Sequence, residues 1–84
     1  MYIHVGNEKL VKTQEIIGIF DLESTTISKR TRDFLTKAEK KKEVITVSYE
    51  LPKSFVLCSS KRRQQTIYIS QLSSSTLLKR SETI

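Results

Sequence analysis

The sequence predicts an α+β fold: a small, mostly antiparallel β-sheet with one long amphipathic helix and a short C-terminal helix. Three observations lead to this prediction. Short runs rich in β-branched and aromatic residues, separated by turn residues, occur before residue 23 and again after residue 43. Between these regions the apolar residues recur at helical spacing. Near the end, a serine-rich segment offers caps for a second helix.

The first part of the chain predicts strands. Residues 2–6 alternate between apolar and polar side chains, and a Gly-Asn turn signal leads to Leu10-Val11, which can start the returning strand of a hairpin. The segment Ile16 to Leu22 is apolar on both faces, as expected of a central strand that is covered on two sides. Gly18 within this segment indicates a bulge or a close approach of another backbone.

The middle of the chain, from Glu23 to Glu43, predicts the long helix. Ser24 or Thr25 can accept a hydrogen bond from the first free helical N–H groups. An apolar set follows within an arc of about 100°, enough to dock on a sheet but too narrow for a helix buried all round; its members are Ile27, Phe34, Leu35 and Ala38. Lys40, Lys41 and Lys42 lie in the last turn, where cations favourably meet the negative end of the helix dipole.

Extended structure is predicted again in the second half. Residues 43–47 and 53–58 read as strands separated by Leu51-Pro52, and the polar segment 59–65 predicts a hairpin loop into a strand at 66–70. A short helix is expected through Leu77–Arg80, with caps available in the SSST segment. We expect residues 1–80 to form a single domain and residues 81–84 a flexible C-terminal tail.

Length and charge limit the function. A chain of 84 residues has room for one core of marginal stability, so self-association would help it. The net charge of +6 and the pI of about 9.7 favour a polyanionic partner such as DNA, RNA or anionic lipid, although such charge can also serve solubility alone. The apolar runs are too short to span a bilayer, and MYIHVG does not resemble a signal peptide, so we expect a cytoplasmic protein without membrane contact.

Catalysis has little support in the sequence. Cys58 is the single cysteine and most simply a small buried apolar residue, and His4 is the single histidine. Because neither residue has a partner for a metal or a nucleophilic site, and no glycine-rich phosphate loop is present, we expect a protein that is not an enzyme and has no cofactor and no metal.

The basic residues form separate clusters. On the long helix, Lys29, Arg30 and Arg32 lie on the side or flanks facing away from the apolar arc; taken alone, this surface is more often a solvated face than a phosphate-binding one. The other clusters favour phosphates, because phosphates need charge and forked donors rather than base-edge geometry. The predicted DNA-binding residues are Lys29, Arg30, Arg32, Lys53, Lys61, Arg62, Arg63, Lys79 and Arg80.

A family resemblance covers almost the whole chain. From Tyr2 to Arg80, the strings YIHVGNEKLV, IIGIFDLESTT, RTRDFL, ELPKSFVL and SSSTLLKR resemble the small bacterial extracellular-matrix regulators RemA and RemB, and are most similar to the RemB branch. The resemblance implies a cytoplasmic regulator of biofilm matrix genes that binds DNA as a homo-oligomeric ring with a basic outer surface. Two departures stand out: Glu15 replaces an arginine of RemA-like proteins, and the segment around Lys53 is arginine-rich in RemA.

Three functions therefore stay open. The first is a homo-oligomeric DNA-binding regulator that holds phosphates and recognises DNA shape. The alternative is a ring-forming protein-interaction module that binds an acidic protein or a RemA-like paralogue without contacting DNA, which Glu15 and the uncharged Leu51-Pro52 favour. RNA binding is third, because the tyrosines at positions 2, 49 and 68 are too scattered to form a stacking platform.

Overall fold

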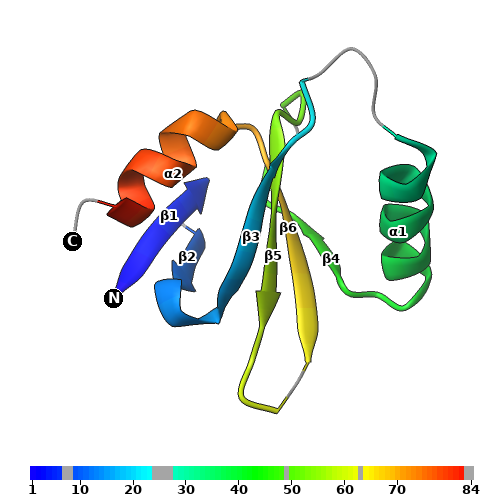
Figure 1. Ribbon diagram of the computed structural model, residues 1–84, viewed down its shortest axis with the longest axis horizontal. Coiled ribbons are helices and arrows are strands. Elements are labelled where there is room, and N and C mark those ends of the chain that lie inside the picture. Colours follow the sequence, from blue (N-terminus) through cyan, green and yellow to red (C-terminus); the bar gives the residue numbers. More distant parts are fainter. Residues whose placement is uncertain (7–8, 24–27, 49, 63, 83–84) are drawn as a thin grey trace.

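The computed structural model describes residues 1–6, 9–23, 28–48, 50–62 and 64–82 (Figure 1). Its elements are, in chain order, β1 (Tyr2–Gly6), β2 (Lys9–Lys12), the 3-10 turn η1 (Thr13–Glu15), β3 (Ile16–Asp21), α1 (Lys29–Lys40), β4 (Val44–Thr46), β5 (Ser54–Ser59), β6 (Gln65–Ser70) and α2 (Ser74–Glu82). The predicted α+β class, the long helix and the short C-terminal helix are confirmed. Because α2 extends to Glu82, it includes the first two residues of the predicted tail.

The prediction of one mostly antiparallel sheet is only partly right, since the described strands form two sheets. β1 and β2 form a separate antiparallel hairpin, and the other four strands have the order β3-β5-β6-β4. The β5–β6 hairpin places β6 between β5 and β4. β6 is therefore antiparallel to β5 and parallel to β4, and the larger sheet is mixed.

The apolar segment at residues 16–22 is not a central strand, as its composition suggested. β3 lies at the edge of the larger sheet and pairs only with β5 among the described strands, while β5 and β6 occupy the centre. The bulge predicted at Gly18 is confirmed, because the β3–β5 register shifts between Ile16 and Gly18. A Cβ at Gly18 would lie 2.8 Å from the Phe20 ring, so a side chain there would require the ring to shift.

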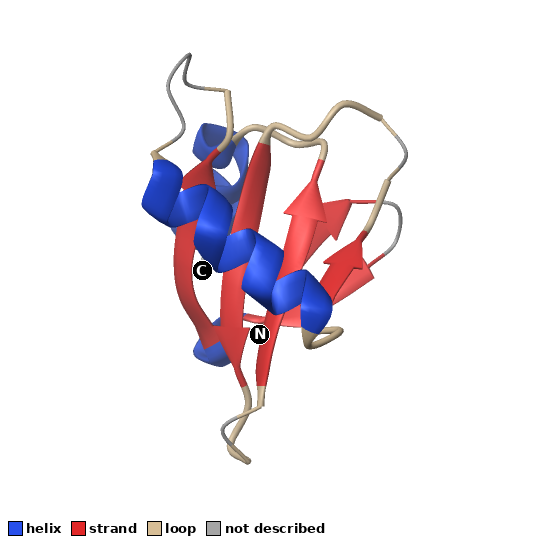
Figure 2. Cartoon of the chain, turned by 90° about the vertical axis from the view of Figure 1, so that its right-hand side faces the viewer, coloured by secondary structure: helices blue, strands red, loops and turns tan. Residues whose placement is uncertain are grey.

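One face of the larger sheet is covered by α1 (Figure 2). Ala38 and the flanking Phe34 and Leu35 pack against Phe55 and Ile67 of the central strands. The helix begins later than predicted because Ser28 is its N-cap: the Ser28 Oγ accepts a hydrogen bond from the Thr31 N–H at 3.2 Å. The predicted caps Ser24 and Thr25, and the apolar Ile27, lie outside the described residues. Of the three terminal lysines only Lys40 is helical, since Lys41 is the C-cap and Lys42 has a φ of 60°.

The opposite face is covered by the β1–β2 hairpin and by α2, as the separation of α1 from these elements in Figure 1 shows. Its buried side chains are Ile3, Val5, Val11, Val56, Cys58 and Leu77, which confirms the prediction of a buried Cys58. The Ser70 Oγ donates to the Val5 carbonyl at 2.6 Å and joins the hairpin to β6. In the part of the chain that the structure describes, no helix combines the length and the apolar character needed to cross a bilayer.

Candidate nucleic-acid interface

The first turn of α1 carries three of the predicted basic residues. Lys29, Arg30 and Arg32 are all exposed, and the turn contains no acidic residue. Among the described residues, none forms an ion pair or a side-chain hydrogen bond with these three cations. They stand at the positive end of the helix dipole, where cations are unfavourable and anions are stabilised. The positive charge of this turn is therefore not neutralised by any of the described side chains.

The last turn of α2 holds the other helical cluster in a different setting. Lys79 and Arg80 stand at the negative end of the helix dipole, which favours cations. The Arg80 Nη1 also donates to the His4 carbonyl at 3.0 Å and so connects α2 to β1. Because α1 and α2 lie on opposite sides of the larger sheet (Figure 1), the two clusters belong to different layers of the fold.

The remaining predicted residues lie at opposite ends of β5. Lys53 precedes the strand, where its main chain donates to the Ser70 carbonyl at 2.9 Å and its side chain is exposed. Lys61 and Arg62 follow the strand at the β5–β6 turn, and both are exposed. Arg63 lies outside the described residues. The structure therefore separates Lys53 from the turn and does not unite the predicted residues in one patch.

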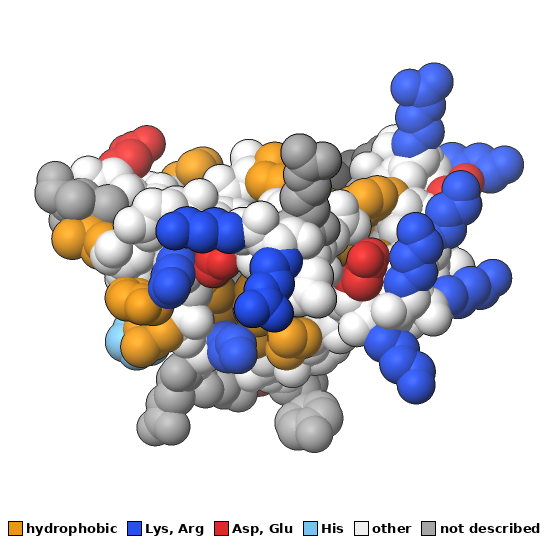
Figure 3. All heavy atoms as spheres, turned by 90° about the horizontal axis from the view of Figure 1, so that it is seen from below, with side chains coloured by type: hydrophobic (Ala, Val, Ile, Leu, Met, Phe, Trp, Pro, Cys, Tyr) orange, Lys and Arg blue, Asp and Glu red, His pale blue; other side chains and the backbone are white. Residues whose placement is uncertain are grey.

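Two further cations lie beside the β5–β6 turn, and the sequence reading did not include them in the site. Lys12, at the end of β2, lines a cleft of about 850 Å³ together with Lys61 and Arg62. Lys42 lines a neighbouring hollow of about 460 Å³, and Gln64 of the turn lines both. Figure 3, a view from below, shows basic side chains over α1 and a second group near the middle of the molecule. Since the packing of the β1–β2 hairpin against the larger sheet brings Lys12 and the turn together from distant parts of the chain, no local sequence signal marks this group.

Glu15 changes the electrostatics of this end of the molecule. It belongs to η1, is half-buried and lines the same cleft as Lys12. Burial, followed by the negative charge of Glu15, raises the pKa of the Cys58 thiol to about 11. Burial also raises the pKa of Tyr68, with smaller effects from Cys58 and Glu15. Within the described ranges, no three His, Cys, Asp or Glu side chains are placed to hold a metal ion.

The fold and surface define a small basic α+β protein. Its core has two parts, one on each face of the larger sheet, and its exposed cations form separate groups. The chain belongs to the RemA-like family, extracellular matrix regulatory protein A-like, whose model matches residues 2–80. It is also 42% identical over 82 residues to Extracellular matrix regulatory protein B of Bacillus subtilis (strain 168), a match that covers 98% of this chain and 91% of that protein. The predicted family and the similarity to RemB are thus confirmed. The family description is that of a regulator of the extracellular matrix rather than of an enzyme.

Proposed function

We propose that this protein is a DNA-binding transcriptional regulator of extracellular matrix genes and that it acts as a homo-oligomer in the cytoplasm. The observation that supports this function most directly is the first turn of α1. Lys29, Arg30 and Arg32 project from a helix start that contains no acidic residue. A DNA phosphate placed there is attracted by the side chains and by the positive end of the helix.

The chemistry of this turn suits backbone contact rather than base reading. Arg30 and Arg32 offer forked donors that match phosphate oxygens, and Lys29 adds a point charge. Ser28 fixes the start of the helix, so the three side chains begin from a defined main chain. Phosphate contacts position a protein on DNA without reading sequence, so selectivity would come from DNA shape and bendability.

The free edge of β3 supports the homo-oligomer. Ile17 is 63% exposed and Phe20 is 43% exposed, although both belong to a strand whose composition is typical of a covered one. The Phe20 ring stacks on Phe55 with centroids 4.8 Å apart, which keeps it at the edge of the sheet. A second copy, or a RemA-like paralogue, pairing with this edge would cover both side chains. Repeated around a ring, each α1 turn would add its contacts to the same duplex.

Fluorescence anisotropy with labelled duplexes tests the function. We expect binding at low salt that weakens steeply as salt rises, and tighter binding to bent A·T-rich DNA than to random DNA. Structured RNA should compete poorly. Absence of DNA binding at low salt would contradict the proposal, and effective competition by RNA would assign the surface to RNA instead.

The protein-interaction alternative has one specific observation in its favour. Glu15 lies among the cations of the β5–β6 end, where it reduces the positive potential that DNA would meet. If this protein acts without contacting DNA, the same titration should show no DNA binding by this protein alone. When a RemA-like paralogue is already on the duplex, adding this protein should leave the affinity of the paralogue for DNA unchanged. A native mass measurement of the mixture would then show the mixed assembly.

A further inference from the structure

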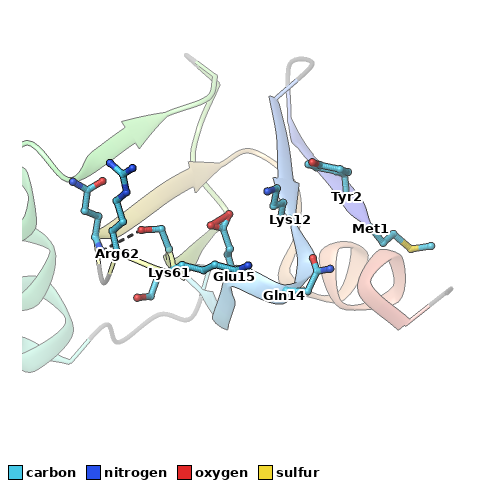
Figure 4. A pocket seen from close by; sticks show the side chains of 10 residues that line it. Met1, Tyr2, Lys12, Gln14, Glu15, Lys61 and Arg62 are labelled. Atoms are coloured by element: carbon cyan, nitrogen blue, oxygen red, sulfur yellow. Dashed lines mark hydrogen bonds between the residues drawn. The ribbon is translucent and has the colours of Figure 1, made fainter.

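A hollow lies between the end of β2 and the β5–β6 turn (Figure 4). It measures about 850 Å³, within the range of about 300–1,000 Å³ that is usual for small-molecule sites. A smaller hollow of about 300 Å³ shares Tyr2, Lys12 and Glu15 with it and reaches Cys58 and Tyr68. The site is therefore an open cleft whose inner end meets the core under the hairpin, and we name it the turn cleft.

The turn cleft brings three cations together. Lys12 comes from β2, and Lys61 and Arg62 come from the β5–β6 turn. Among the described residues, none forms a hydrogen bond or an ion pair with the side chains of these three. Together with the carboxylate of Glu15, they leave a net charge of +2 on the lining side chains. Such a set of unpaired donors suits a ligand with several phosphate oxygens.

Glu15 gives the cleft a second, opposite chemistry. Figure 4 shows it between Arg62 and Lys61 on one side and Lys12 and Tyr2 on the other. It lines the smaller hollow together with Cys58 and Tyr68, so it stands toward the inner end. A carboxylate only accepts hydrogen bonds, and its two oxygens match a pair of neighbouring N–H donors. Guanine presents such a pair on its Watson–Crick edge, whereas adenine presents an acceptor beside its amino group.

Tyr2 adds a surface on which a flat ring can lie. Its side chain is 55% exposed and lines both hollows. Aromatic stacking on a base is typically worth about 1–3 kcal/mol in nucleic-acid-binding proteins. We propose that the turn cleft binds a guanine nucleotide, with Lys12, Lys61 and Arg62 on its phosphates and Glu15 on the edge of its base.

Isothermal titration of the full chain with GDP, ADP and inorganic pyrophosphate tests this site. We expect saturable binding of one GDP per chain and an affinity for GDP at least about 10-fold higher than for ADP, because one bidentate pair discriminates by about 1–3 kcal/mol. Glu15→Gln should bring the affinity for GDP down to that for ADP without weakening the binding of pyrophosphate. The double variant K61A/R62A should weaken all three ligands by at least about 10-fold.

Two controls locate the effect. Lys53 is an exposed lysine at the opposite end of β5, so Lys53→Ala should leave all three affinities unchanged. The triple variant K29A/R30A/R32A should also bind GDP normally, because α1 lies across the sheet from the hairpin. That variant separates this inference from the DNA-binding function, since either can fail while the other stands. Circular dichroism of each variant establishes that it is folded.

Three results would overturn the inference. The first is absence of saturable binding of GDP up to about 5 mM, a range in which even millimolar affinities are detected. The second is equal binding of GDP and ADP that Glu15→Gln does not change, which would reveal unspecific attraction of phosphates. The third is a loss in K53A as large as that in K61A/R62A, which would show that net charge rather than the turn cleft holds the ligand.

Discussion

The two helices of this protein carry the same kinds of basic residues in opposite physical settings. In α2, Lys79 and Arg80 are in the last turn, where the helix dipole favours cations, and Arg80 donates to the main chain of β1. In α1, Lys29, Arg30 and Arg32 are in the first turn, where the dipole opposes them and no acid compensates. The fold thus accounts for the cations of α2 but not for those of α1. The proposed function assigns the α1 turn to a partner that supplies negative charge.

The two helices also differ in how they are anchored, and truncating the anchor of α2 should produce the largest change. Leu77 is fully buried between α2 and the hairpin. Leu77→Ala should lower the free energy of unfolding by about 2–5 kcal/mol, because it removes transfer energy and leaves a cavity. Urea denaturation measures this loss. DNA affinity per folded molecule should stay the same, and a loss of affinity in fully folded protein would show that α2 belongs to the interface.

Removing the cations of α1 should act on binding and not on stability. The triple variant K29A/R30A/R32A should lower DNA affinity by about 100-fold near 0.1 M salt, as expected for the loss of several phosphate contacts. Its melting temperature should be unchanged or slightly higher, because positive charge leaves the positive end of the helix. The matched variant K79A/R80A removes two cations from α2 and should reduce the affinity far less. Equal losses in the two variants would erase the distinction between the helices.

The N-cap of α1 links the stability of this helix to its proposed role in DNA binding. The Ser28 Oγ accepts from the Thr31 N–H, so Ser28→Ala should cost about 1 kcal/mol of unfolding free energy and loosen the first turn. DNA affinity should fall by a few-fold although no basic residue is lost. Ser28→Asp is the matched comparison: it restores a cap but adds negative charge, so it should restore stability and weaken binding further. Tighter binding by the Asp variant would speak against phosphates at this turn.

The hydrogen bond of Arg80 predicts a smaller effect on stability. Arg80→Ala should reduce the unfolding free energy by less than about 1 kcal/mol, since Arg80 is exposed and a single hydrogen bond contributes about that much. Thermal denaturation measures the change, and Arg80→Lys, which cannot reproduce the forked donor, should recover only part of it. A larger loss of DNA affinity than of stability would return Arg80 to the set of DNA-binding residues predicted from the sequence.

The last prediction concerns high pH, outside the range in which the protein would bind DNA, and serves as a check on the core beneath α2. The pKa of Cys58 is raised from an ordinary value of 9.0 to about 11 by burial and then by Glu15. The folded protein therefore holds this proton more tightly than the unfolded chain, and the associated stability is complete below about pH 9 and declines as the pH rises through about 11. Thiolate absorbance of the folded protein should show this late titration. A titration near pH 9 in folded protein would mean that Cys58 is open to water.

The sequence was a better guide to the local elements than to which elements lie next to one another in the fold. The hairpin of β1 and β2 and the bulge at Gly18 follow from short-range signals, and both are confirmed. The position of β3 could not be predicted, because a strand that is apolar on both faces looks the same whether its own sheet or a second molecule covers it. The N-cap was misplaced because several serines and threonines that can cap a helix precede α1, and the sequence does not show that Ser28 is the one that accepts from the Thr31 N–H.

The candidate site shows the same difference between residues that are neighbours in the sequence and residues that meet only in the fold. The basic turn of α1 was visible in the sequence because its residues are neighbours along one helix. Lys12 and Lys42 were not, because the packing of the hairpin on the larger sheet brings Lys12 to the β5–β6 turn and the pairing of β4 with β6 brings Lys42 there. The predicted role of Lys53, Lys79 and Arg80 in DNA binding stays a prediction, which K79A/R80A tests for the two residues of α2.

The salt dependence of DNA binding tests the distinction between the helices most directly. Anisotropy titrations over a range of salt concentrations give the slope of log K against log salt, which changes by about 0.9 for each phosphate contact. We predict that K29A/R30A/R32A makes this slope shallower by about 2–3 for each subunit engaged on the duplex, while K79A/R80A leaves it unchanged. A slope that K79A/R80A reduces and K29A/R30A/R32A does not would contradict the account, because the cations that the fold already uses would then be the ones that hold DNA.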